Sequence, residues 1–165
     1  MFESLQSWIS SVPEALQWLA VMVASMVPFI DSYEGAFVGV LVGIFPPLAI
    51  AAAIVGNTAS MLLFVRFGNA ILARRQRKAA ASAKAEAKQQ AKQEKVHRAM
   101  DRWGVPGGAL LGPFLLPPQF TALAMISFGA TRRWVVLWQA ISITMWGILF
   151  GLLGIVTLSM IGAGA

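Results

Sequence analysis

The chain has 165 residues, of which 58% are hydrophobic and 12% charged, with 13 Lys and Arg, seven Asp and Glu and a mean hydropathy of +0.70. A soluble domain carries about 25% charged residues, so this composition favours a membrane protein. The absence of cysteine excludes disulfides and thiolate chemistry, and the single histidine, His97, excludes a multi-histidine metal site. We therefore expect an all-α polytopic integral membrane protein with no cofactor, no metal and no enzymatic activity.

The first apolar stretch runs from Leu16 to Ile30 and is interrupted by polar residues from Asp31 onward. Counted from Trp8, it reaches the length of about 20 helical residues that crosses a bilayer. Residues 1–11 lack the basic segment of a secretory signal, so we expect this stretch to be a retained, short first span.

A second apolar segment, from Ala36 to Val55, contains the pair Pro46-Pro47. Proline lacks a backbone N–H and disfavours helix in the preceding residue, so we expect a helix to end at this pair and restart beyond it. The segment is predicted to be a re-entrant hairpin or a broken span. An apolar run from Thr58 to Leu72 follows.

Residues 73–103 differ sharply, because ten of the 13 Lys and Arg lie here among Ala, Gln and Glu. This composition favours a solvated helix without an apolar face. The positive-inside rule assigns the segment to the cytoplasm. The sequence therefore divides into a first membrane repeat (1–72), a basic cytoplasmic linker helix (73–103) and a second membrane repeat (104–165).

The second repeat opens with many helix breakers, between Gly104 and Ala130, which predict a second re-entrant hairpin. A hairpin that returns leaves Arg132 and Arg133 on the cytoplasmic side, in agreement with the positive-inside rule. The stretch from Trp134 to Ile161 is then the clearest full span, and the C-terminus lies outside.

The two halves share a broken apolar pattern. Gly43-Ile44-Phe45-Pro46-Pro47-Leu48-Ala49 in the first half is matched by Pro113-Phe114-Leu115-Leu116-Pro117-Pro118-Gln119 in the second. Paired, proline-interrupted apolar segments are typical of transporters built from internal repeats, because irregular backbone in a bilayer must line a cavity or be buried in protein. We expect two Pro-broken re-entrant hairpins related by an internal, inverted repeat.

The side of the N-terminus is left open. Glu3 and Glu14, without any Lys or Arg nearby, favour an external N-terminus, which requires an odd number of crossings before the linker. A hairpin flanked by two spans gives an even number.

The chain resembles the bacterial small multi-drug export family, which is distantly similar to the DedA/VTT superfamily. The residues that carry the resemblance are Pro28, Glu34-Gly35-Ala36, the Gly43 to Ala49 motif, Gly56-Asn57, Arg102-Trp103-Gly104, Pro117-Pro118, Ala124 and Gly129-Ala130. The resemblance implies two oppositely oriented re-entrant hairpins and a transporter or lipid flippase driven by an ion gradient.

Two carboxylates are the strongest candidates for substrate or proton binding. Asp31 and Glu34 are three residues apart and share a face of any helix that contains both. A carboxylate near or in the bilayer costs several kcal/mol unless it is solvated, paired or protonated, so it often marks an ion or proton path. Alternatively, residues 31–33 simply cap the next helix.

Three further polar residues are candidates for the same site. Arg66 either snorkels to the headgroups or pairs with Glu34 or an anionic substrate. Asn57 and Gln119 follow the proline turns, where free N–H groups and helix dipoles can hold a phosphate or carboxylate, or they satisfy loose carbonyls. We expect Pro46, Pro47, Pro117 and Pro118 to shape the cavity.

The function expected from these features is proton-coupled export of hydrophobic or cationic small molecules across the bacterial plasma membrane, with Glu34 as the exchangeable site. A DedA-like flippase for polyprenyl phosphate or phospholipid is the first alternative, and a non-transporting membrane assembly protein is the second. The basic linker lacks the aromatic residues of a nucleic-acid platform and suits anionic lipid instead. A chain with so few spans is expected to form a homodimer.

Overall fold

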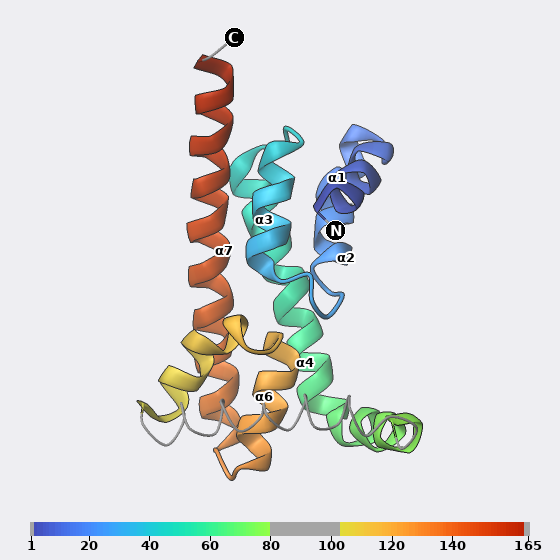
Figure 1. Ribbon diagram of the computed structural model, residues 1–165, viewed down its shortest axis with the longest axis vertical. Coiled ribbons are helices and arrows are strands. Elements are labelled where there is room, and N and C mark those ends of the chain that lie inside the picture. Colours follow the sequence, from blue (N-terminus) through green and yellow to red (C-terminus); the bar gives the residue numbers. More distant parts are fainter. Residues whose placement is uncertain (1, 80–102, 164–165) are drawn as a thin grey trace. The chain divides into compact units, whose positions relative to one another are not determined.

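The computed structural model describes residues 2–79 and 103–163 (Figure 1). Every regular element in these ranges is a helix, which confirms the all-α prediction. In chain order they are α1 (Phe2–Ser11), the 3-10 helix η1 (Glu14–Leu16), α2 (Gln17–Ala24), α3 (Ser32–Leu41), α4 (Pro46–Ala79), the helical residues 103–111, the 3-10 helix η2 (Gly112–Phe114), α6 (Pro118–Ser127) and α7 (Arg132–Ala163). Most of the predicted linker, residues 80–102, lies outside the described residues.

The helices form two compact units. Unit 1 consists of Met1–Ser60 and Ile141–Ala165, and unit 2 consists of Met61–Ala140. Both long helices, α4 and α7, continue from one unit into the other. These units reflect packing, whereas the predicted segments 1–72, 73–103 and 104–165 reflect charge and hydropathy, so the units do not test the predicted segments.

Two helices are long and apolar enough to cross a membrane. They cover 23 residues of α4, Pro46–Gly68, and 30 residues of α7, Arg132–Ile161. Within an apolar window of 18 residues in each span, only 39% and 28%, respectively, is buried inside the protein. A core helix of a soluble protein would bury most of its surface, and this exposure therefore supports a membrane environment.

Unit 1 is packed through small residues on α3, which lies between α2 and α7 in Figure 1. A Cβ on Gly35 would collide with Ser25 Oγ, and one on Gly39 would lie 3.0 Å from the Ala49 Cβ. A Cβ on Gly56 of α4 would collide with the backbone carbonyl of Met22. Such close backbone approach is the usual way in which helices associate inside a bilayer.

The C-terminal half of α7 packs on the same bundle through a second set of glycines. A Cβ on Gly147 would lie 2.8 Å from the Ile54 side chain, and one on Gly151 would collide with Ile50. One on Gly154 would lie 3.1 Å from the Val40 Cβ. These glycines let α7 approach both α3 and α4, while the larger apolar residues of α7 remain exposed.

The first proline pair begins a helix and does not break one. The sequence predicts a re-entrant hairpin or a broken span over Ala36 to Val55, with a helix that ends at the proline pair and restarts beyond it. In the structure α3 already ends at Leu41, ahead of the pair, and α4 begins at Pro46 itself. Proline suits the first turn of a helix, where its missing N–H would have no partner. The chain reverses earlier, in the turn 42–45, where Gly43 has a φ of 92°.

The hairpin of unit 1 is therefore formed by α2 and α3, which pack against each other and are joined by residues 25–31. The predicted first span, Leu16 to Ile30, is wrong as a single helix, because α2 ends at Ala24 after eight residues. Even with η1 it is too short to cross a bilayer. The joining segment contains Phe29 at a φ of 83°, a conformation unusual for an aromatic residue.

The same succession of elements occurs twice. α3 and α6 each have ten residues, and α6 and α7 begin 86 residues after α3 and α4, respectively. Both short helices end in a Schellman motif, in which a glycine takes a φ of 92°. The N–H of Gly43 donates to the Val40 carbonyl, and the N–H of Gly129 donates to the Ile126 carbonyl. The proline pairs are consequently not equivalent, because Pro46-Pro47 opens a long helix and Pro117-Pro118 a short one.

Candidate functional site

The start of α3 uses one acidic residue as a cap and leaves the other for a different role. Asp31 occupies the N-cap position but its side chain forms no capping hydrogen bond. Instead, the Glu34 carboxylate accepts a hydrogen bond from the backbone N–H of Asp31. This contact is one half of a capping box, in which an acidic residue at the third helical position reaches back to the N-cap. Glu34 therefore has a structural role, and the Asp31 carboxyl is not used to cap the helix.

Asp31 belongs to a buried polar cluster in unit 1. The members of this cluster come from the end of α2, the start of α3 and the middle of α4, and each is at most 4% exposed: Ser25, Asp31, Ser32, Asn57 and Ser60. Two of the hydroxyls tie the helices together, since Ser32 Oγ donates to the Ile143 carbonyl of α7 at 2.8 Å and Ser60 Oγ donates to the Met26 carbonyl at 2.7 Å. The cluster is thus a fixed polar site inside an apolar bundle.

The Asp31 carboxyl is only partly satisfied within this cluster. The Asn57 side chain lies close enough to interact with it. Its Oδ1 atom and the Ser25 Oγ atom have no hydrogen-bond partner among the described residues. The Glu34 carboxylate adds like charge nearby. A buried carboxyl in this setting is stable as a neutral acid or beside a bound cation.

The cluster lies at the middle of the candidate span of α4. Asn57 is eleven residues from Pro46 and eleven from Gly68, which are the ends of that span. At 1.5 Å per residue this is about 16 Å from either end. Because Asn57 interacts with Asp31, the carboxyl lies at about the same depth.

The charged side chains of unit 1 are all negative. Its two segments contain four charged side chains, namely Glu3, Glu14, Asp31 and Glu34. The first basic residue of the chain is Arg66, and all 13 Lys and Arg lie between residues 66 and 133. Hence no basic side chain of unit 1 can neutralise Asp31.

Of the other predicted site residues, Asn57 belongs to unit 1, and Gln119 and Arg66 belong to unit 2. Asn57 lies in the interior of α4 and not at a helix start, contrary to the prediction, because Gly56-Asn57 does not interrupt the helix. Gln119 is the second residue of α6, directly after Pro117 and Pro118, and is fully buried in unit 2. Arg66 is exposed in unit 2, with its guanidinium 5.8 Å from the Phe67 ring centroid.

Of the four predicted cavity-shaping prolines, Pro117 and Pro118 are buried in unit 2, where they form the N-cap and first residue of α6. Pro46 and Pro47 are partly or fully exposed at the start of α4. Their role is to start the two helices.

Sequence reasoning missed several buried polar residues. Ser25 was counted within a continuous apolar stretch, although it is fully buried beside Gly35. Gln139, in the clearest apolar span, is also fully buried, and neither atom of its side-chain amide has a hydrogen-bond partner among the described residues. In both cases a polar residue within an apolar run of the sequence could have indicated a buried polar site.

Comparison of the chain with protein families, with curated proteins and with solved structures gives no match. The resemblance to small multi-drug export proteins therefore stays a prediction. Among the described residues, no group of three or more His, Cys, Asp or Glu could hold a metal ion.

The capping role of Glu34 is testable by stability. Replacing Glu34 by Ala removes the hydrogen bond to the Asp31 N–H and should lower the free energy of unfolding by about 1 kcal/mol. Replacement by Gln preserves a capping-box acceptor and should restore most of it. Thermal unfolding in detergent, followed by tryptophan fluorescence, provides the measurement. Equal stability of the Ala and Gln variants would contradict this role.

Proposed function

We propose that this chain is a proton-coupled carrier of hydrophobic cations in the bacterial plasma membrane. Asp31 is the carboxyl that alternately binds the proton and the substrate. The proposal rests on the burial of Asp31 beside Asn57, at the midpoint of the candidate span of α4, in a unit without a Lys or Arg side chain. Ionisable groups at such depth commonly belong to ion or proton pathways.

The backbone around Asp31 supports the same proposal. The carboxyl lies where the chain passes from α2 to α3 through a non-helical segment that includes the unusual Phe29. Transporter sites are typically formed by discontinuous helices near the middle of the bilayer, because their ends expose polar backbone to the substrate. The sequence prediction assigned the exchangeable carboxyl to Glu34, but its capping contact makes Asp31 the better candidate.

The sign of the charge favours a cationic substrate. Every charged side chain of unit 1 is a carboxylate, so an anionic headgroup would meet repulsion there and a cation attraction. A lipid flippase would need the phosphate to be held elsewhere, for example by Arg66 in unit 2. The flippase is therefore the alternative that the transport experiment below must exclude.

The proposed topology removes a conflict in the sequence analysis. If α2 and α3 form a re-entrant hairpin, α4 is the one crossing before the basic linker. An odd number of crossings puts the acidic N-terminus outside and residues 73–103 in the cytoplasm, as the positive-inside rule requires. α7 then returns from Arg132 and Arg133 inside to the C-terminus outside.

The transport proposal is tested with proteoliposomes that contain the pH dye pyranine. Adding a quaternary ammonium dye outside should drive protons out of the lumen, so that the internal pH rises. Asp31→Asn, which cannot exchange a proton, should abolish this rise, because the replacement removes the acid with little change in shape. Glu34→Gln is the matched control on the same helix and should retain it.

A pH rise that persists in Asp31→Asn would overturn the proposal. If the wild type gives no pH change but moves a fluorescent anionic phospholipid between leaflets, the flippase alternative replaces it. If neither activity is found, the assembly-protein alternative gains support.

The topology is tested by single cysteines, since the natural chain has none. Ser4→Cys and Ser159→Cys should react with a membrane-impermeant maleimide added to intact spheroplasts. Ser82→Cys, in the basic linker, should react only after permeabilisation. Labelling of positions 4 and 82 on the same side would show that the first half crosses the membrane an even number of times.

A further inference from the structure

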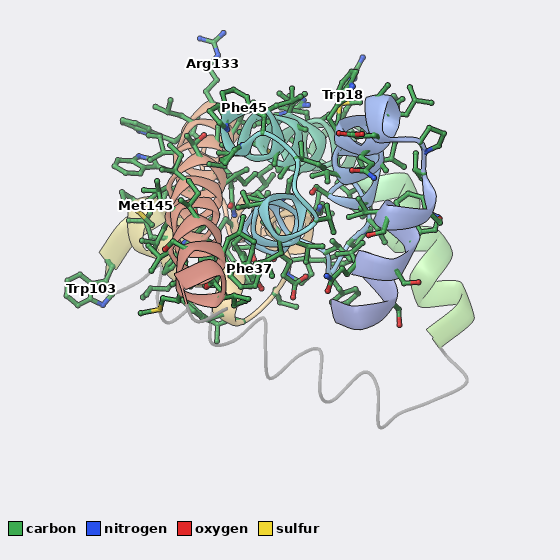
Figure 2. The ribbon with its side chains drawn as sticks, turned by 90° about the horizontal axis from the view of Figure 1, so that it is seen from above. Trp18, Phe37, Phe45, Trp103, Arg133 and Met145 are labelled. Carbon is green, nitrogen blue, oxygen red and sulfur yellow. The ribbon has the colours of Figure 1, made fainter. Side chains whose placement is uncertain are left out.

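A second feature of unit 1 is an open groove of about 400 Å³, in the range of small-molecule sites. One wall is formed by Glu14, Gln17 and Trp18, at η1 and the start of α2. The other is formed by residues 42–45 and Leu48, where α3 turns into α4. Figure 2 shows Trp18 and Phe45 projecting on the same side of the unit. The groove lies at the opposite end of α3 from Asp31.

The groove combines a carboxylate with exposed aromatic rings. Glu14 and Trp18 are four residues apart and lie on one face of the helical turn. The indole Nε1 donates to the Ala15 carbonyl at 2.9 Å, so the polar N–H of this ring is already bonded within the chain. Phe45 is 69% exposed on the opposite wall. Aromatic faces beside a carboxylate are the chemistry that binds organic ammonium and phosphonium ions.

The helix backbone at the groove also contributes a negative partial charge. α3 ends here, and the carboxyl end of a helix dipole is negative. The lining contains no Lys or Arg, and neither do residues 1–65. An anionic ligand would therefore find no counter-charge in the groove or in the rest of unit 1.

We propose that this groove is a peripheral binding site for a hydrophobic organic cation, held between Trp18 and Phe45 and neutralised by Glu14. The ten residues of α3 separate it from Asp31 by about 15 Å. The groove is thus where the carrier would hold its substrate at the end of the span, before or after exchange at Asp31. The inference rests on the proposed function for the identity of the cargo, but binding in the groove does not require Asp31.

Equilibrium dialysis of radiolabelled tetraphenylphosphonium against the full-length protein in detergent tests this site. The measurement uses the Asp31→Asn background, which removes the central carboxyl and leaves the groove intact. Adding Glu14→Gln and Trp18→Leu should weaken binding by about tenfold, the combined effect of an exposed charge and a cation–π contact. Adding Trp8→Leu instead, an exposed tryptophan of α1 outside the groove, should change nothing. Tetraphenylborate, which has the same shape and opposite charge, should bind weakly to all of them.

Unchanged affinity in the Glu14→Gln/Trp18→Leu protein would overturn the groove site and leave Trp18 and Phe45 as membrane-interface anchors. Equal binding of tetraphenylborate would also overturn it. A third result separates the two sites. If Asp31→Asn alone abolishes cation binding, while Glu14→Gln/Trp18→Leu in the wild-type background does not weaken it, the cation binds at Asp31 and not in the groove. Groove binding without any proton movement in the wild type would retain this inference and defeat the proposed function.

Discussion

Unit 1 buries the Asp31 carboxyl, and this burial costs free energy. A charged carboxylate removed from water is stable only beside a counter-charge, and otherwise it takes up a proton. The cluster around it supplies neutral groups, namely serine hydroxyls and the Asn57 amide, and unit 1 contains no basic side chain. The neutralising partner must therefore come from outside the unit. A proton and an organic cation are alternatives at such a site, and competition between them is the basis of coupled exchange.

The packing of unit 1 keeps this carboxyl in place. Small residues at Gly35, Gly39 and Gly56 bring the backbones of α2, α3 and α4 into direct contact, so that two helices of eight and ten residues can be held deep in the bundle. The Ser32 hydroxyl fastens the start of α3 to α7. Because Glu34 caps α3, the Asp31 side chain is available to a ligand.

The sequence predicted helices and spans better than it predicted where the chain turns. Hydropathy identified α7, and its continuous apolar run has no breaker that could mislead. Proline was ambiguous, since Pro46-Pro47 and Pro117-Pro118 look alike in sequence but begin helices of very different length, α4 with 34 residues and α6 with ten. The better marker of the repeat was glycine, because Gly43 and Gly129 both take the positive φ that a Schellman turn requires. The choice between Asp31 and Glu34 could not be made from spacing, because it depends on which carboxyl is used to cap α3.

In the proposed mechanism one carboxyl, that of Asp31, exchanges a proton for a cation. Infrared difference spectroscopy of the reconstituted protein, with and without tetraphenylphosphonium, reports on this step directly. Cation binding should remove the C=O stretching band of a protonated carboxyl; Asp31→Asn should lack this change and Glu34→Gln should retain it. A band that is unaffected by the cation, or that still responds in Asp31→Asn, would show that Asp31 does not exchange a proton for the cation.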